Sequence, residues 1–162
     1  MLASAQAIGG LLAGVLVARI ALKRSPRVLF AGGLIGLGLA DIGVANSAAL
    51  APPGPGAMMA ASGFMLLAGF PVVASVAAGH GLLQTLTADA YRGRVFGALG
   101  TVQGMAILIG LALGGAAIDT VGVAPVLSAG AAMWIVGGMV ALARLPRGEG
   151  NLPAREQGVG AL

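Results

Sequence analysis

Residues 28–46 read VLFAGGLIGLGLADIGVAN, an apolar run whose only charged residue is Asp41. Such a run is close to the roughly 20 residues that an α-helix needs to cross about 30 Å of hydrocarbon. Four further apolar runs lie at about residues 2–22, 57–84, 95–118 and 121–143. None alternates polar and apolar residues with a long period of two, so barrel strands are not expected. The sequence predicts an all-α, polytopic transmembrane bundle of about five spans within residues 1–145.

The composition excludes a water-soluble helical bundle. Of the 162 residues, 58% are hydrophobic and only 9% are charged, whereas soluble domains carry about 25% charged residues. The 29 glycines suit membrane helices, where glycine lets backbones approach closely. The chain has no cysteine, so a disulfide framework and a thiolate metal site are excluded. The lipid bilayer is therefore the first expected partner.

The basic residues alternate between the two sides of the expected bundle. They lie beside the first connection, in the third connection and in the tail, and the second and fourth connections have none. The nine are Arg19, Lys23, Arg24, Arg27, Arg92, Arg94, Arg144, Arg147 and Arg155. By the positive-inside rule, the C-terminus and residues 146–162, expected to be a flexible tail, are cytoplasmic, and the N-terminus is outside. These residues form no continuous patch, so nucleic acid is not an expected partner.

The first apolar run is not expected to be a signal peptide, because its charges follow the run and none precedes it. An N-terminus outside the membrane then lacks a preceding helix to direct it. This suggests that helices upstream of Met1 are missing. The expected location is a multi-pass position in the cell (inner or plasma) membrane.

Residues 83–97, LQTLTADAYRGRVFG, resemble the loop between helices ten and eleven of major facilitator superfamily carriers. The pattern is Asp89, two residues, then Arg92, Gly93 and Arg94 followed by valine, as in the drug and siderophore exporter branch. Residues 110–122, GLALGGAAIDTVG, are similar to helix eleven of that branch. Ala88 stands where those carriers often have proline.

The first apolar run resembles helix eight of the same carriers. Gly14 and Arg19 match the loop motif that follows that helix, whereas Ala18 and Ala21 replace its aspartate and second glycine. The resemblance covers about residues 2–145 and implies helices eight to twelve of a twelve-helix carrier. The intact protein would then export a small-molecule substrate by alternating access, with proton coupling. Missing N-terminal helices are the implied partner.

Four polar side chains are candidates for coupling or substrate contact. Asp41 lies about 6 Å from the expected midplane; it is either a proton-coupling carboxylate or a hydrogen-bonded residue near the outer interface. His80 and Gln84, one helical turn apart, either line a cavity or are ordinary interfacial residues. Gln103 either bonds a neighbouring helix or faces substrate. The resemblance implies that Arg92 and Arg94 contact helix ends or acidic groups and stabilise one state; they would also anchor the topology.

Small residues and one proline are expected to shape the helix packing. Glycines paired at a spacing of four are predicted packing faces: Gly10 and Gly14, Gly32 and Gly36, Gly100 and Gly104, and Gly110 and Gly114. Pro71 is expected to kink the third run. No catalytic constellation, cofactor site or metal site is expected, so an enzyme is excluded. The alternative to a partial carrier is a stand-alone membrane scaffold or an accessory subunit that packs against another membrane subunit.

Overall fold

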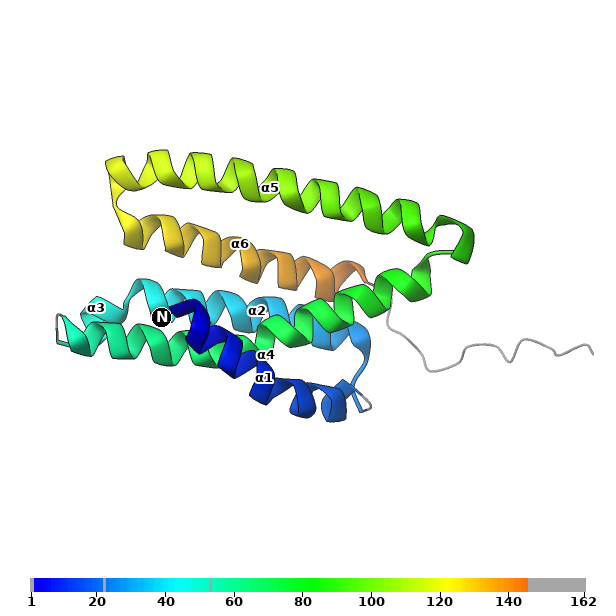
Figure 1. The fold of residues 1–162 in the computed structure, drawn as a ribbon, viewed down its shortest axis with the longest axis horizontal. Coiled ribbons are helices and arrows are strands. Elements are labelled where there is room, and N and C mark those ends of the chain that lie inside the picture. The colour runs from blue at the N-terminus through cyan, green and yellow to red at the C-terminus, as the bar shows by residue number, and fades with distance from the viewer. Residues whose placement is uncertain (1, 22, 53, 146–162) are drawn as a thin grey trace, which may run out of the picture.

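The computed structural model of the chain describes residues 2–21, 23–52 and 54–145, and the expected tail at 146–162 lies outside these ranges. Within them the chain is helical and has no strand, so the all-α prediction is confirmed (Figure 1). The helices are α1 (Leu2–Ala21), α2 (Pro26–Ala45), α3 (Ser47–Leu50), α4 (Pro55–Leu86), α5 (Arg92–Val121) and α6 (Val123–Arg144), with a 3₁₀ turn, η1 (Asp89–Tyr91).

Four of the described helical stretches are long and apolar enough to cross a membrane: Pro26–Ala45, Pro55–Leu86, Asp89–Val121 and Val123–Arg144. α1 contributes a shorter apolar stretch, Ser4–Ile20. Large hydrophobic side chains cover the outside of the bundle, with Leu11 79% and Met59 76% exposed. Such a surface fits a protein surrounded by lipid rather than water.

The helix boundaries follow proline and glycine. α2 and α4 each begin at a proline, Pro26 and Pro55, because the first turn of a helix needs no N–H donor there. The expected link at Asp119–Thr120 is wrong as a boundary, since α5 continues to Val121. Gly122 ends the helix instead, with a φ of 86° that only glycine adopts readily.

Two of the expected connections contain helical turns. The proline-rich second connection, residues 47–56, begins with the single helical turn of α3, whose N–H groups bond back to Asn46. In the third connection, η1 leads directly into α5, so Gly93 and Arg94 lie in the first turn of that helix. Gly93 therefore has helical backbone.

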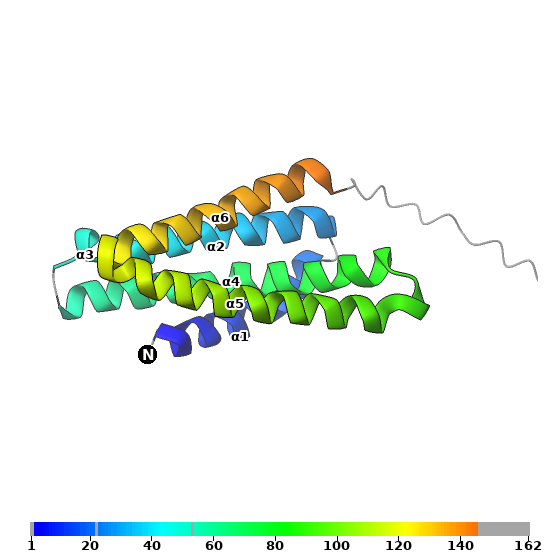
Figure 2. The same cartoon turned by 90° about the horizontal axis from the view of Figure 1, so that it is seen from above.

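Two helices organise the bundle. α2 packs against α4 on one side and α6 on the other, and α1 packs against α4 (Figure 2). The α2–α4 contact is close at Gly33, where an added Cβ would lie 2.7 Å from the Pro71 carbonyl oxygen. The α2–α6 contact is close at Gly38 and Gly138, where the nearest atoms would be 2.6 Å away. Glycine thus brings helix backbones together, as is common in membrane bundles.

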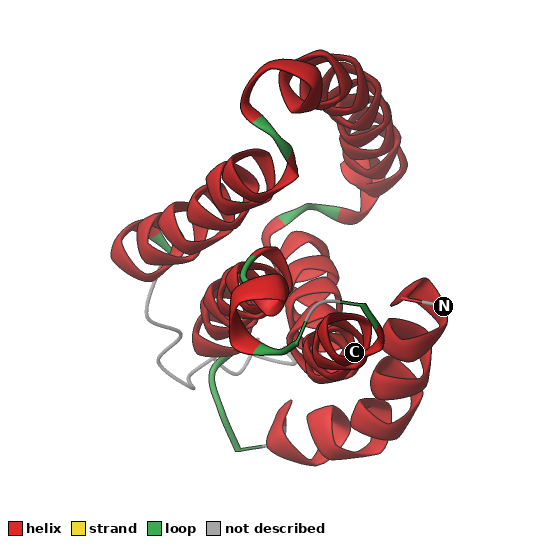
Figure 3. Ribbon diagram, turned by 90° about the vertical axis from the view of Figure 1, so that its left-hand side faces the viewer, coloured by secondary structure: helices red, strands yellow, loops and turns green. Residues whose placement is uncertain are grey.

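Helix α5 stands apart from this packed unit. None of its residues is buried, and in the end-on view it lies away from α1 and α2 (Figure 3). It joins the rest through the turn at Gly122 and through η1 at its other end. The described structure is therefore a glycine-packed unit of α1, α2, α4 and α6 with a long, uncovered helix beside it.

The described basic residues gather at one end of the molecule. The antiparallel arrangement of helices brings the first connection, the α4–α5 turn and the end of α6 to the same end (Figure 1). We call this the basic end; it carries Lys23, Arg24, Arg92, Arg94 and Arg144.

Candidate functional site

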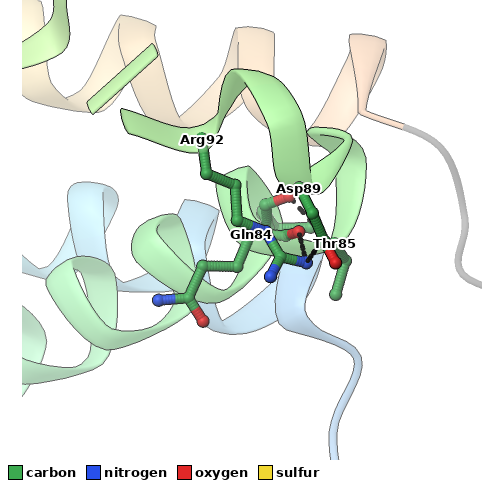
Figure 4. Close-up of polar contacts among 5 residues, drawn as sticks. Gln84, Thr85, Asp89 and Arg92 are labelled. Atoms are coloured by element: carbon green, nitrogen blue, oxygen red, sulfur yellow. Dashed lines mark hydrogen bonds and ion pairs between the residues drawn. The ribbon is translucent and has the colours of Figure 1, made fainter. Parts of the chain in front are cut away.

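Arg92 joins three parts of the α4–α5 turn at the basic end. Its Nη2 lies 2.9 Å from an oxygen of the Asp89 carboxylate and donates a 3.0 Å hydrogen bond to the backbone carbonyl of Gln84 (Figure 4). That carbonyl belongs to the last turn of α4, where carbonyls lack partners within the helix. A cation at a helix C-terminus also favours the helix dipole. Arg92 therefore caps the C-terminal end of α4, contacts η1 through Asp89, and is itself the first residue of α5.

Two aromatic contacts flank this turn. The guanidinium of Arg94 lies 6.0 Å from the centre of the Tyr91 ring, which is within the range of a cation–π contact. The rings of His80 in α4 and Phe96 in α5 are stacked at 5.7 Å. The Arg94–Tyr91 contact joins η1 to the first turn of α5, whereas the His80–Phe96 contact joins α4 to α5 beyond the turn.

The turn is exposed to its surroundings. The side chain of Arg92 is 46% exposed and that of Asp89 is 87% exposed. Exposed ion pairs contribute at most about 1 kcal/mol, because water and salt screen them. The arrangement therefore positions α5 but stabilises it only weakly, which suits a joint between two helices more than a rigid core.

Asp41 lies in the half of α2 farther from the basic end and is half-buried. At 3.6 residues per turn its direction is about 80° from Gly33, which contacts α4, and about 60° from Gly38, which contacts α6. The carboxylate thus lies on the strip of α2 between its two packed faces. Within the described residues it forms no ion pair and no side-chain hydrogen bond. Both readings of its role stay predictions.

The four polar candidates do not form one cluster. His80 and the Gln84 side chain are exposed near the basic end of α4, and Gln103 is exposed on α5. No hydrogen bond between side chains joins any of them to Asp41 in the described ranges. Gln84 accepts its hydrogen bond through its backbone carbonyl and not through its side-chain amide. A shared cavity would need further helices to close it.

The remaining candidates occupy varied places. Arg19 is exposed near the end of α1, and no atom lies within 4 Å of a Cβ placed at Gly14 or Gly110. For Gly114 the nearest such atom, in Val126 of α6, is 3.9 Å away. Pro71 is buried inside α4, where the helix continues through it.

The spacing rule selected only some of the closely packed glycines. Of those it selected, an added Cβ at Gly10 would lie 3.3 Å from Val73 and one at Gly36 would lie 3.0 Å from Pro71. Gly33, Gly38, Gly69 and Gly138 meet backbone of a neighbouring helix, whereas Gly32 meets nothing within 4 Å. A spacing of four identifies small faces but does not tell which helix covers them. The sequence does contain a spacing of five between Gly33 and Gly38. This spacing places the two glycines on different faces of α2, one toward α4 and the other toward α6.

Arg27 is a second arginine that contacts a helix end, although the sequence predicted it only as a marker of membrane topology. Its guanidinium donates a hydrogen bond to the backbone carbonyl of Leu142 and so ties the start of α2 to the end of α6. Its Nε is buried without a hydrogen-bond partner among the described residues. Like Arg92, it satisfies a carbonyl at the C-terminal end of a helix.

The described residues contain no group of three or more histidine, aspartate or glutamate side chains that could hold a metal ion. The polar arrangement that remains is a set of helix-end contacts at the basic end and an isolated carboxylate deep in α2. Comparison with known proteins gave no match to a family model, to a curated protein or to a solved structure.

Proposed function

We propose that this chain is an integral membrane protein that forms part of a secondary active transporter of the major facilitator type. In the proposed topology α1, α2, α4, α5 and α6 each cross the membrane, with the basic end in the cytoplasm. The intact carrier would export a small molecule by alternating access, coupled to protons. The resemblance of residues 83–97 to a carrier loop motif is what suggests this family.

The observation that carries the proposal is the uncovered α5. It is 30 residues long and has no buried residue, yet it carries Gly97, Gly100 and Gly104 with no atom within 4 Å of an added Cβ. At Gly33 and Gly38 of α2, by contrast, glycine lies where two helix backbones touch. Gln103 adds an amide at a depth where lipid offers no hydrogen-bond partner. Both features favour further transmembrane helices packed against α5.

The topology has a direct test, because the chain lacks cysteine. Single cysteines at Ala49, in α3, and at Ala90, in η1, are both on exposed positions at opposite ends of the bundle. In intact cells a membrane-impermeant maleimide should label Ala49→Cys. It should label Ala90→Cys only after the cells are permeabilised. The reverse pattern would refute the orientation, and equal labelling of both in intact cells would refute the placement of the two ends on opposite sides of the membrane.

The transporter assignment has a separate test. We expect that cells expressing this chain alone show no substrate efflux above an empty-vector control, because the second half of the translocation path would be missing. Sustained efflux by the chain alone would refute the partial-carrier proposal. The reading frame upstream of Met1 gives a second test: seven further in-frame apolar segments are expected, and a separate promoter directly upstream would contradict the proposal.

A stand-alone scaffold or accessory subunit is the second candidate function. The observation that favours it is the unit of α1, α2, α4 and α6, which is held together by glycine contacts without any further helix. In that case α5 would receive a helix from a separate membrane subunit. Co-purification of one stoichiometric membrane partner, together with a separate upstream promoter, would support this function over the carrier.

A further inference from the structure

A groove of about 500 Å³ lies between α1, α2 and α4. Its α2 wall contains Gly32, Gly33 and Gly36, and its α4 wall contains Phe70 and Pro71. Its volume is within the roughly 300–1,000 Å³ of sites that bind small ligands. The lining is largely hydrocarbon and backbone, so an apolar occupant fits it.

The groove exists because α1 and α2 both pack on α4 rather than along each other. α1 meets α4 where Gly9 and Gly10 approach Gly69. α2 meets α4 where Gly33 approaches Pro71. Between these two contact lines, α2 presents Gly32, and no atom lies within 4 Å of a Cβ placed there. The missing side chain leaves the space open.

One end of the groove is charged. Arg24 lines it at the basic end of the bundle. Within the described ranges its guanidinium pairs with no carboxylate and donates no hydrogen bond to the protein. Of the other described arginines at this end, Arg92 bonds Asp89, Arg27 bonds the Leu142 carbonyl and Arg94 lies on Tyr91, while Arg144 does not line the groove. Arg24 is thus a cation at the mouth of an apolar groove, available to an anionic group.

The length of the groove matches one leaflet of a membrane. From Pro26, where α2 begins, to Gly36 is ten residues, or roughly 15 Å at 1.5 Å per residue. Half of a hydrocarbon core of about 30 Å is also roughly 15 Å. The groove therefore extends from the level of the lipid head groups to about the bilayer midplane. An acyl chain of the adjacent leaflet spans the same depth.

We propose that this groove binds one acyl chain of an anionic phospholipid, whose phosphate is held by Arg24. Charge complementarity selects the occupant, since basic residues between transmembrane helices at the membrane surface favour anionic head groups. The proposal rests on the membrane placement proposed above, but it does not depend on transport. It holds equally for a partial carrier and for a scaffold.

The test is lipid retention by the full chain in detergent micelles, measured by native mass spectrometry. Phosphatidylglycerol and phosphatidylcholine with identical acyl chains are titrated separately. We expect saturable binding of one phosphatidylglycerol and several-fold weaker binding of phosphatidylcholine. Arg24→Gln should weaken phosphatidylglycerol binding by roughly fivefold and remove the preference between the two lipids.

A second variant tests the groove itself. Gly32→Leu places a side chain into the open space without meeting protein atoms within 4 Å of its Cβ, so it should abolish the saturable binding of either lipid. Matched controls are Gly63→Leu, an exposed and equally open glycine of α4 outside the groove, and Lys23→Gln, an exposed cation beside Arg24. Both controls should bind like the unaltered chain. Circular dichroism of each variant shows whether the helices are retained.

The outcomes separate this inference from the proposed function. Unchanged lipid binding by folded Gly32→Leu, or equal binding of both lipids by the unaltered chain, would overturn the inference. Loss of binding in the two controls would also overturn it, because the lipid would then coat the whole surface. If Gly32→Leu instead changes the oligomeric mass and leaves lipid binding unchanged, the occupant of the groove is a helix of another chain and the inference fails. Release of the chain from membranes by alkaline carbonate would refute the membrane placement itself.

Discussion

Adjacent glycines in α2 allow the energy of one helix contact to be isolated. At Gly33 an added Cβ would lie 2.7 Å from both the Pro71 carbonyl oxygen and the Ser75 nitrogen, whereas at Gly32 it would meet nothing within 4 Å. Because both obstacles at Gly33 are backbone atoms, no side-chain rotation relieves them. To reach ordinary contact at 3.4 Å, α2 and α4 must separate by about 0.7 Å.

The expected difference follows from two opposing effects. Either glycine-to-alanine change gains up to about 1 kcal/mol of helix propensity. Forcing an extra carbon into a close-packed contact costs about 1–3 kcal/mol, and only Gly33→Ala carries that cost. We expect Gly33→Ala to be less stable than Gly32→Ala by about 1–3 kcal/mol. The comparison between neighbours cancels effects of depth, lipid and helix length.

The assay is reversible unfolding in mixed micelles by titration with a denaturing detergent. Helix content by circular dichroism and fluorescence of Trp134, the only tryptophan, give two independent probes. Equal unfolding free energies for the two variants would refute the close α2–α4 contact. A less stable Gly32→Ala would refute it more strongly, since that position should only gain.

Two further substitutions probe the turn and the uncovered helix. Arg92→Gln should lower the unfolding free energy by at most about 1 kcal/mol, because the ion pair is exposed; it should also speed hydrogen exchange in residues 87–91 more than Arg94→Gln does, and equal exchange in the two variants would contradict the helix-end contact. Gly104→Leu on α5 should not lower the stability of the isolated chain and should raise it by up to about 1 kcal/mol through helix propensity, because nothing contacts that position; a loss of several kcal/mol would show that α5 packs within this chain.

The helical architecture was readable from sequence because long apolar runs without a period of two favour helices of membrane-spanning length. The predicted runs began at residues 28 and 57, two residues after the observed helix starts at Pro26 and Pro55, because the prolines were placed in the connections although proline fits the first turn of a helix. The end of α5 was misplaced at Asp119–Thr120 because both side chains are polar, yet neither prevents a helix. Gly122 ends the helix because its backbone adopts a positive φ.

Which glycines pack could not be read in the same way. Gly32 and Gly33 are adjacent glycines, and the sequence does not tell which one contacts another helix. Only the rotation of α2 about its axis relative to α4 decides this. The separation of α5 was equally hidden, because its hydropathy resembles that of the packed helices. The resemblance implied that Arg92 contacts a helix end or an acidic group, whereas Arg27 was predicted only as a topology marker. Which carbonyls they contact, those of Gln84 and Leu142, depends on which helix ends become neighbours.

The pairing of α2 with α6 across an intervening α4 and α5 sets an order of events during synthesis. About 100 residues separate the end of α2 at Ala45 from the end of α6 at Arg144. At roughly 5–20 residues per second, the ribosome needs about 5–20 s to deliver the second partner after the first. For that interval the face of α2 around Gly38 has no partner from its own chain. During that period only molecules other than this chain can shield the face around Gly38.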